Sequence, residues 1–203
     1  MKIFLTGTDT SVGKTVISSW LCCHTSYSYW KPIQSGELEL SDSKIVENIS
    51  KTIIHKESYL FKNPVSPHLA SILEKKSIDI NTITLPNEKN LIVEGVGGVL
   101  VPLNEKTLLV DFIESLNIPV ILVVRSTLGT INHTLLSLEA LKKRSIPILG
   151  VIMNGPLNKD NIEAIEFYGK IKVIATFPKL EKISDNAIKS IELPSSLKEL
   201  LET

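Results

Sequence analysis

Cysteine is scarce in this chain of 203 residues, which contains only Cys22 and Cys23. Two neighbouring cysteines cannot build a disulfide framework, and no metal-ligand spacing can be made from them. Both fall in an expected first helix, where a free cysteine is typically a small, buried apolar side chain. This cysteine usage favours a reducing, cytoplasmic setting.

An excess of one charge is also absent, because 22 lysines and arginines balance 22 aspartates and glutamates. Net charge therefore gives no reason to expect nucleic acid or an anionic membrane as a partner. Long apolar runs are missing too. No stretch reaches the roughly 18 apolar residues of a membrane-spanning helix, and the run in MKIFLTG is too brief for a secretory signal.

Short apolar runs alternate with longer amphipathic stretches along the whole chain. Six runs are typical of strands, at 2–6, 27–31, 90–95, 119–124, 147–153 and 172–176, and helical patterns lie at 14–23, 42–50, 66–76, 107–116, 130–144 and 159–168. The runs at 119–124 and 147–153 are apolar at successive positions, as in a parallel sheet covered on both faces. The alternation predicts one α/β domain over 1–203, a doubly wound, mostly parallel, Rossmann-like three-layer sheet.

Two segments stand outside this alternation. Residues 51–89 are the least regular part of the chain and hold three of its ten prolines. We interpret them as an inserted segment that shapes a site rather than as a second domain. The stretch SSLKELLET, residues 195–203, predicts a short closing helix.

The first expected strand runs into GTDTSVGKT, residues 7–15, and then into a helical pattern. Counted back from Gly13, the first glycine of the pattern G-x-x-x-x-G-K-[ST] would fall at Thr8, but the chain has Gly7 instead. Such a turn offers backbone N–H groups and a helix N-terminus to phosphate, Lys14 adds positive charge and Thr15 can ligate Mg²⁺. The alternative is an ordinary turn with a chance GKT. The predicted nucleotide-binding residues here are Ser11, Val12, Gly13, Lys14, Thr15 and Val16.

An acid stands at the end of the third expected strand, where NLIVEG runs into VGG. Glu94 in this position resembles a Walker B group that binds Mg²⁺ directly or through water. The glycines that follow it let the backbone approach a ligand, so Gly95, Val96 and Gly97 join the predicted site. The alternative is a solvated glutamate that precedes a turn.

Lys31 and Asp42 follow the second expected strand. Lys31 should lie at the same edge of the sheet as Lys14, and two ammonium groups there would repel unless something strongly anionic lay between them. A triphosphate with an acidic co-substrate would qualify, and a surface lysine is the alternative. Asp42 could cap the helix that begins there or offer its carboxylate to the metal. The sequence leaves these two interpretations of Asp42 open.

Two further turns follow the fourth and fifth expected strands. In RSTLGTINH the turn at Gly129, with Thr130 or Asn132 near the helix start, predicts a second anion site. His133 has no acid spaced to partner it, which favours a structural role over that of a general base. In VIMNGP, Asn154 could bind a purine edge with Gly155 beside it, or simply form an Asn-Gly turn.

Taken together, these motifs resemble one family. GTDTSVGKT, KPIQSG (31–36), SD (41–42), SPH (66–68), VEGVGG (93–98), GTINH (129–133) and Asn154 occur in the order and approximate spacing of the ATP-dependent dethiobiotin synthetases of biotin biosynthesis. The resemblance covers about residues 1–178, and the family's GTDT-x-x-GKT loop accounts for the displaced first glycine. It implies a P-loop fold and a cyclo-ligase that joins CO₂ to the two amines of 7,8-diaminopelargonate. In that reaction a carbamate takes the γ-phosphoryl group of ATP, and the second amine then displaces phosphate.

The resemblance also implies a role for each matching residue. Lys14 would neutralise the transferring phosphoryl group and Lys31 would bridge it to the carbamate, while Thr10 and Ser35 would hydrogen-bond the reacting groups. Thr15, Asp42 and Glu94 would hold Mg²⁺, and Asn154 would bind the base. The substrate's distal carboxylate would lie across a two-fold interface of a homodimer, on Gly129, Thr130, Ile131 and Asn132.

The chain departs from the family's pattern in two places. Ser11 stands where the family often has Glu, and the tail after Pro178 is short. Phe177 and Pro178 are then the candidates to line the base pocket. A ParA/MinD-like switch ATPase is the main competing interpretation, but TGTDTSVGK lacks the early lysine usual in that loop. An amide ligase of the cobyric acid type would need a glutaminase domain, for which the chain has no room.

Overall fold

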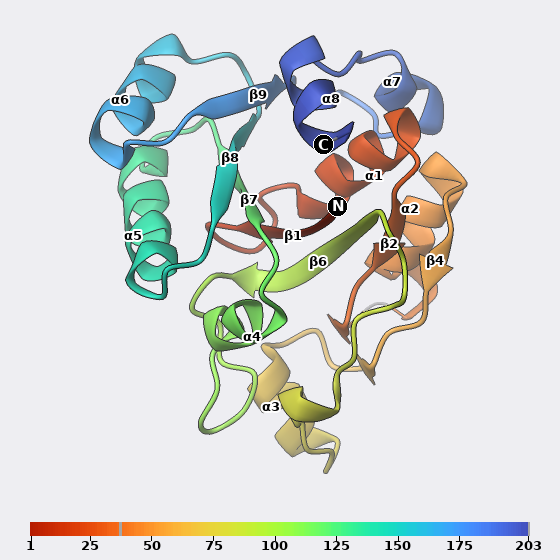
Figure 1. Ribbon diagram of the computed structural model, residues 1–203. Helices are drawn as coiled ribbons and strands as arrows, with labels where there is room; N and C mark the ends of the chain where they lie inside the picture. The colour runs from red at the N-terminus through yellow and green to blue at the C-terminus, as the bar shows by residue number, and fades with distance from the viewer. Residues whose placement is uncertain (37, 203) are drawn as a thin grey trace.

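A seven-stranded sheet forms the centre of the molecule (Figure 1). The computed structural model describes residues 1–36 and 38–202. Every pairing in this sheet is parallel, and the spatial order is β4-β2-β6-β1-β7-β8-β9. The strands are β1 (Lys2–Gly7), β2 (Ser28–Trp30), β4 (Ile54–His55), β6 (Leu91–Gly98), β7 (Val120–Arg125), β8 (Ile148–Asn154) and β9 (Val173–Phe177).

The predicted three-layer α/β fold is confirmed, because helices cover both faces of this sheet. All six predicted strands are present, and β7 is apolar at successive positions because it is buried on both sides. The helices are α1 (Lys14–His24), α2 (Asp42–Ser50), α3 (Pro67–Leu73), α4 (Leu109–Leu116), α5 (Thr130–Lys143), α6 (Lys159–Gly169), α7 (Asp185–Lys189) and α8 (Ser195–Glu202). The predicted closing helix is thus present up to residue 202, and its last predicted residue, Thr203, lies outside the described residues.

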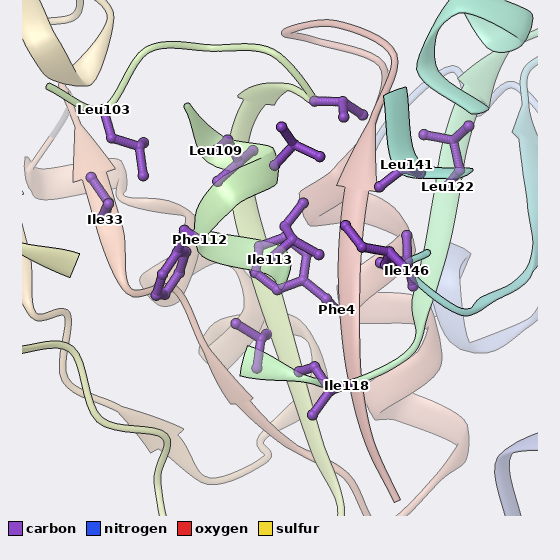
Figure 2. Close-up of a cluster of buried hydrophobic side chains, with 14 of the residues drawn as sticks. Phe4, Ile33, Leu103, Leu109, Phe112, Ile113, Ile118, Leu122, Leu141 and Ile146 are labelled. Atoms are coloured by element: carbon purple, nitrogen blue, oxygen red, sulfur yellow. The ribbon is translucent and has the colours of Figure 1, made fainter. Parts of the chain in front are cut away.

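Each face of the sheet has its own apolar cluster. One cluster packs α4, α5 and α6 against the sheet, with Phe4 and Phe112 in edge-to-face contact at 6.3 Å between ring centroids (Figure 2). The other packs α1, α2, α7 and α8 against the opposite face. The carboxyl ends of β1, β6 and β7 are held rigidly between these two layers, and ligands of such sheets collect at that edge.

The irregular segment 51–89 packs back onto the chain that follows β2. Its residues form β4 at the edge of the main sheet and β5 (Tyr59–Phe61), which pairs in parallel with β3 (Ile33–Ser35). The N–H of Gly36 donates to the carbonyl of Phe61 at 3.0 Å, and a Cβ on Gly36 would lie 2.7 Å from the Pro64 ring. This segment therefore fixes residues 33–36, in agreement with its interpretation as an insertion that shapes a site.

The C-terminal helices close the face that α1 covers. The indole N–H of Trp20 donates to the Ile191 carbonyl at 2.6 Å, and the hydroxyl of Tyr27 donates to the Leu201 carbonyl at 2.8 Å. Phe177 is buried edge-to-face on Trp20 at 5.1 Å. The predicted pocket-lining position of Phe177 is therefore wrong, because its ring lies in the core. Over residues 1–36 and 38–202, no helix combines the length and apolarity needed to cross a membrane.

Candidate active site at the carboxyl edge of the sheet

The phosphate-binding loop has the predicted strand–turn–helix context. It leaves β1 after Gly7 and enters α1 at Lys14. Gly13, the residue before the helix, has φ 98°, and a Cβ there would lie 2.0 Å from the side-chain nitrogen of Asn154. Only glycine fits this position, for reasons of both backbone conformation and space. Within the loop, Ser11 also adopts a left-handed conformation, with φ 53°.

Lys14 is nearly buried under this loop. Its ammonium donates to the carbonyls of Asp9 at 3.0 Å and Gly97 at 2.8 Å, which ties the loop to the end of β6. Burial, and next the positive charge of Lys31, lower the pKa of Lys14 to about 8. A bound anion would stabilise the charged form of Lys14 and raise its pKa again. The position of Lys14 is therefore suited to binding an anion.

Lys31 is the centre of a buried polar network, so its alternative interpretation as a surface lysine is wrong. The residue is 3% exposed. Its ammonium forms ion pairs with the Asp42 carboxylate and, at 3.1 Å, with Oε1 of Glu94. Although burial opposes the charge, the carboxylates of Glu94 and Asp42 raise the pKa of Lys31. Lys31 is therefore held as a cation at this edge of the sheet.

Asp42 points into the same network instead of capping its helix. The cap of α2 is Ser41, whose side chain accepts from the Lys44 N–H, so the capping interpretation of Asp42 is wrong. The Asp42 carboxylate accepts from the hydroxyl of Thr15 at 2.6 Å, and its backbone N–H donates to Oε1 of Gln34. Despite its burial, the ammonium of Lys31 lowers the pKa of Asp42.

Glu94 lies in the middle of β6 rather than at its end. The strand continues to Gly98, four residues beyond Glu94, and Glu94 is 1% exposed, so the solvated alternative is wrong. Its Oε2 accepts from Ser18 at 2.6 Å, and its Oε1 lies 3.1 Å from the hydroxyl of Thr15. The extension of the strand depends on pairing with β1, which reaches from Lys2 to Gly7 with a register irregularity. No local pattern in the sequence encodes this pairing.

A cleft of about 430 Å³ opens over these groups. Twelve of the predicted site residues line it: Thr10, Ser11, Gly13, Lys14, Thr15, Val16, Lys31, Ser35, Asp42, Glu94, Val96 and Gly97. The hydroxyl of Ser35 is buried and has no hydrogen-bond partner among the described residues. A larger groove, of about 650 Å³, lies between α3 and residues 104–107 and shares none of these residues. The chemistry is therefore concentrated in the smaller cleft.

Four other predicted residues lie beside the cleft rather than in its lining. Val12 is buried, and its carbonyl accepts from the side chain of Asn154 at 2.9 Å. Asn154 thus braces the phosphate-binding loop with one N–H. Gly155 has φ 131° and donates to the Phe177 carbonyl. Gly95 is buried against the ring of Phe4, which a Cβ would approach within 2.9 Å.

The predicted second anion site lies apart from this cleft. Gly129 precedes α5 with φ 89°, and the buried hydroxyl of Thr130 donates to the Arg125 carbonyl at 2.6 Å. Ile131 is half-buried and Asn132 is exposed. His133 lines a neighbouring hollow of about 350 Å³, together with Leu100 and Leu136. The structure therefore separates this turn from Lys14 and Lys31 within one chain.

The hydroxyl and carboxylate oxygens around Lys31 are suitable ligands for a hard divalent cation. Thr15, Asp42 and Glu94 bring a hydroxyl and two carboxylates together, with the Thr15 hydroxyl within 3.1 Å of both acids. Mg²⁺ prefers such oxygen ligands and is typically bound by one or two carboxylates together with substrate phosphates. The described residues contain no group of three or more His, Cys, Asp or Glu side chains suited to a metal ion.

Sequence reasoning missed four residues that shape the site. Ser18 and Gln34 hold Glu94 and Asp42, Pro64 lines the cleft from the inserted segment, and Arg125 contacts the phosphate-binding loop. Ser18 lies one helical turn after Lys14, which places it near the loop and is a usable signal. Pro64 reaches the cleft only because β5 pairs with β3, and no local pattern predicts that pairing.

The chain is similar to known proteins along almost its whole length. A family model described as an AAA domain matches residues 1–187. The ATP-dependent dethiobiotin synthetase BioD of Lawsonia intracellularis is 52% identical over 200 residues, with 98% of each chain covered. The protein of the same name from Paramagnetospirillum magneticum is 43% identical, with 95% of each chain covered.

A solved structure titled as a ParA family ATPase from Chlorobium tepidum aligns with a TM-score of 0.51 at 14% identity, covering 98% of this chain and 95% of that one. This likeness confirms the P-loop fold and does not extend to function. By its sequence similarity over nearly the full length, the chain belongs to the family of ATP-dependent dethiobiotin synthetases, which are ligases of biotin biosynthesis.

Proposed function

We propose that this chain joins CO₂ to the two amines of 7,8-diaminopelargonate and closes the cyclic urea of dethiobiotin, while ATP becomes ADP and phosphate. The observation that carries the proposal is the pair of buried lysines, Lys14 and Lys31, which line one cleft together with the carboxylates of Asp42 and Glu94. The whole chain, 1–203, would act as one ligase domain.

The chemistry needs this kind of site because two anions must meet. The first amine captures CO₂ as a carbamate, and a carbamate oxygen then attacks the γ-phosphorus of ATP. The bond from phosphorus to the bridging oxygen of ADP breaks, which leaves a carbamic-phosphoric anhydride. The second amine attacks the carbonyl carbon and expels phosphate. Catalysis therefore rests on positioning and charge neutralisation, with no protein nucleophile.

The two lysines divide this task. Lys14, at the entrance of α1, would neutralise the transferring phosphoryl group. Lys31, which follows β2, would bridge that group to the carbamate. The free hydroxyl of Ser35 and that of Thr10, which lies on the loop, would hydrogen-bond the reacting groups. These roles are supported by the position of all four residues on the same cleft.

Mg²⁺ would be held by Thr15, Asp42 and Glu94 and would neutralise charge on the β and γ oxygens of ATP. Ser11, Val12, Gly13 and Val16 would contribute backbone N–H groups to the phosphates, and Gly95, Val96 and Gly97 would let β6 approach the nucleotide. Asn154 would bind the base beside Gly155. Its amide donates one N–H to Val12 and carries an oxygen and a second N–H besides.

A homodimer would complete the substrate site. The turn at Gly129–Asn132 would bind the distal carboxylate of a diamine held in the cleft of a second copy. Leu128 is fully exposed at this turn, and Leu100 and Leu136 nearby are each more than half exposed. Apolar side chains gathered beside a polar turn are typical of a protein interface. The cytoplasm is the setting we infer, since Cys22 and Cys23 are both free thiols.

The test is whether phosphate release from ATP depends on the diamine. Purified protein is incubated with ATP, Mg²⁺, bicarbonate and 7,8-diaminopelargonate, and phosphate release and dethiobiotin are measured together. We expect phosphate and dethiobiotin to form in equal amounts, with release close to background when the diamine is omitted. Phosphate release that ignores the diamine would contradict the proposal and favour a switch ATPase.

A further inference from the structure

Arg125, the last residue of β7, reaches across to the phosphate-binding loop. One guanidinium nitrogen, Nη2, donates to the Thr10 carbonyl at 2.7 Å and pairs with Oδ2 of Asp9 at 3.3 Å. The other carboxylate oxygen of Asp9 accepts from the Thr10 N–H at 2.7 Å. Arg125 therefore holds the first half of the loop through both the backbone and a side chain.

Asn154, at the end of the neighbouring strand β8, holds the second half of the loop. Asn154 is the register partner of Arg125 in the β7–β8 pairing. Its side chain donates to the Val12 carbonyl at 2.9 Å. Arg125 and Asn154, at the same level of the sheet edge, thus donate hydrogen bonds to the carbonyls of two loop residues, Thr10 and Val12. Ser11 is the residue between Thr10 and Val12.

Ser11 adopts a backbone conformation that its side chain disfavours. Its φ of 53° lies in the left-handed region, where a Cβ meets steric resistance that glycine avoids. A non-glycine residue persists in this region when its surroundings over-determine it. The contacts on either side of Ser11 provide such constraint, because they hold the carbonyl of the residue before it and the carbonyl of the residue after it.

We propose that Arg125 is a positioning residue that keeps the phosphate-binding loop preorganised by holding the strained backbone at Ser11. The proposal rests on the proposed function, in that the loop must bind ATP. Without the Arg125 contact the loop would relax, and ATP would have to reorder it on binding. Arg125 is absent from the lining of the cleft, which agrees with an action through Thr10 rather than on the substrate itself.

The chain contains only two arginines among its 22 basic residues, and the second one, Arg144, serves as a matched control for Arg125. Arg144 also pairs with an aspartate, Asp111 at 2.8 Å, beyond the end of α5. Arg125→Met and Arg144→Met therefore remove the same group and one ion pair each, and both keep the aliphatic stem. ATP affinity is measured by calorimetry with each variant, and thermal unfolding is followed in parallel.

We expect Arg125→Met to weaken ATP binding about fivefold and Arg144→Met to leave it within the measurement error. The deciding comparison uses Ser11→Gly, since glycine tolerates the left-handed conformation. In the Ser11→Gly background, Arg125→Met should weaken ATP binding less than twofold relative to Ser11→Gly alone. Arg125→Lys, which keeps the charge but not the planar fork, should lie between wild type and Arg125→Met.

Two results would overturn the inference. One is unchanged ATP affinity in folded Arg125→Met. The other is an equal loss in the wild-type and the Ser11→Gly backgrounds, which would mean that Arg125 acts by its charge and not by holding the loop. If Arg125→Met unfolds, the same comparison is made with Arg125→Lys. Wild-type protein that binds no ATP would instead contradict the proposed function, so the two failures are distinguishable.

Discussion

The two halves of the carboxyl edge of the sheet differ in how far one chain buries and pairs their side chains. Around β2 and β6, the side chains of Lys31, Asp42 and Glu94 are paired with one another and are largely buried. Beyond β7, Leu128 in the turn before α5 and Asn132 in the first turn of α5 are exposed to solvent. One chain therefore completes the buried cluster of paired charges, whereas the other half of the edge leaves apolar and polar side chains exposed.

This contrast has a physical origin. A buried charge is tolerated only when it is paired, so the lysine and the two carboxylates must be fixed within the fold of a single chain. A carboxylate at the far end of a long substrate can be bound at a partly exposed turn, because backbone N–H groups and a helix N-terminus are already oriented there. Separation of the two functions would thus match the length of the substrate.

Lys31→Ala should reduce turnover more than any other substitution considered. We expect turnover to fall by at least about a thousandfold, because the bridging charge is lost and the Asp42 and Glu94 carboxylates repel each other. The free energy of unfolding should also fall, by about 3–5 kcal/mol, since a buried ion pair loses one partner. Steady-state kinetics and chemical denaturation measure both quantities.

Lys44→Ala, on the exposed face of α2, is the control for Lys31→Ala and should change neither quantity. ATP binding to folded Lys31→Ala should persist, because Lys14 and the loop N–H groups remain. Normal turnover by this variant would show that the role assigned to Lys31 is wrong.

The next largest loss of turnover is expected from a substitution in the turn after β7. Leu128→Asp places a charge on a fully exposed side chain, so it should leave the fold intact and weaken the proposed dimer. We expect a shift toward monomer in sedimentation at micromolar concentration and a loss of turnover of about tenfold or more. Ile53→Asp, at an exposed position before β4, is the control. A monomer with full turnover would remove the substrate site from the interface.

The two lysines should respond differently to pH. Burial and Lys31 lower the pKa of Lys14 to about 8, whereas the neighbouring carboxylates raise that of Lys31. As pH rises through about 8, Lys14 loses its proton in the protein alone, and ATP must bind with uptake of a proton. Affinity should then fall by up to about tenfold per pH unit above that value.

Calorimetry in buffers of different ionisation enthalpy measures this proton uptake directly. We expect little uptake by Lys14 well below a pH of about 8 and an approach to one proton about one pH unit above it. Lys14→Met should bind ATP weakly and show no such rise. A wild-type affinity that is independent of pH across this range would contradict the assignment of Lys14 as the phosphate-binding cation.

The smallest effect is expected from Ser18→Ala. Its hydroxyl donates to Oε2 of the buried Glu94, and loss of that bond leaves an acceptor without its donor. The free energy of unfolding should fall by about 1–3 kcal/mol. Ser50→Ala, at the end of α2, is the matched control and should cost less, because the Ser50 hydroxyl donates to the backbone carbonyl of Val46. A loss no larger than that of the control would mean that Ser18 does not hold Glu94.

The sequence predicted the repeating part of the fold well, because its periodicity is local. The bounds of α2, residues 42–50, were predicted without error, and all six strands of the alternating pattern are present. Features that depend on distant pairing were missed. β3, β4 and β5 have only two or three residues each, too few for a periodic signal, and they form because other strands lie beside them.

The same distinction explains the site. Gly13, Lys14 and Thr15 could be assigned from a short motif that combines a turn with a helix start. The burial of Lys31 depends on two carboxylates from α2 and β6, which lie 11 and 63 residues away in the sequence. Asp42 was left open between cap and ligand because both roles use a carboxylate at a helix start. The position of Ser41 as the cap of α2 excludes the capping role.

A crystal structure with a non-hydrolysable ATP analogue, Mg²⁺ and 7,8-diaminopelargonate is the most direct measurement. We propose that two lysines at one edge of the sheet hold a phosphoryl group and a carbamate within reach of each other. The Lys31 ammonium is then expected within hydrogen-bonding distance of the terminal phosphate, with Lys14 on the same group. An ammonium of Lys31 that stays remote from the phosphate, with both ligands bound, would contradict this proposal.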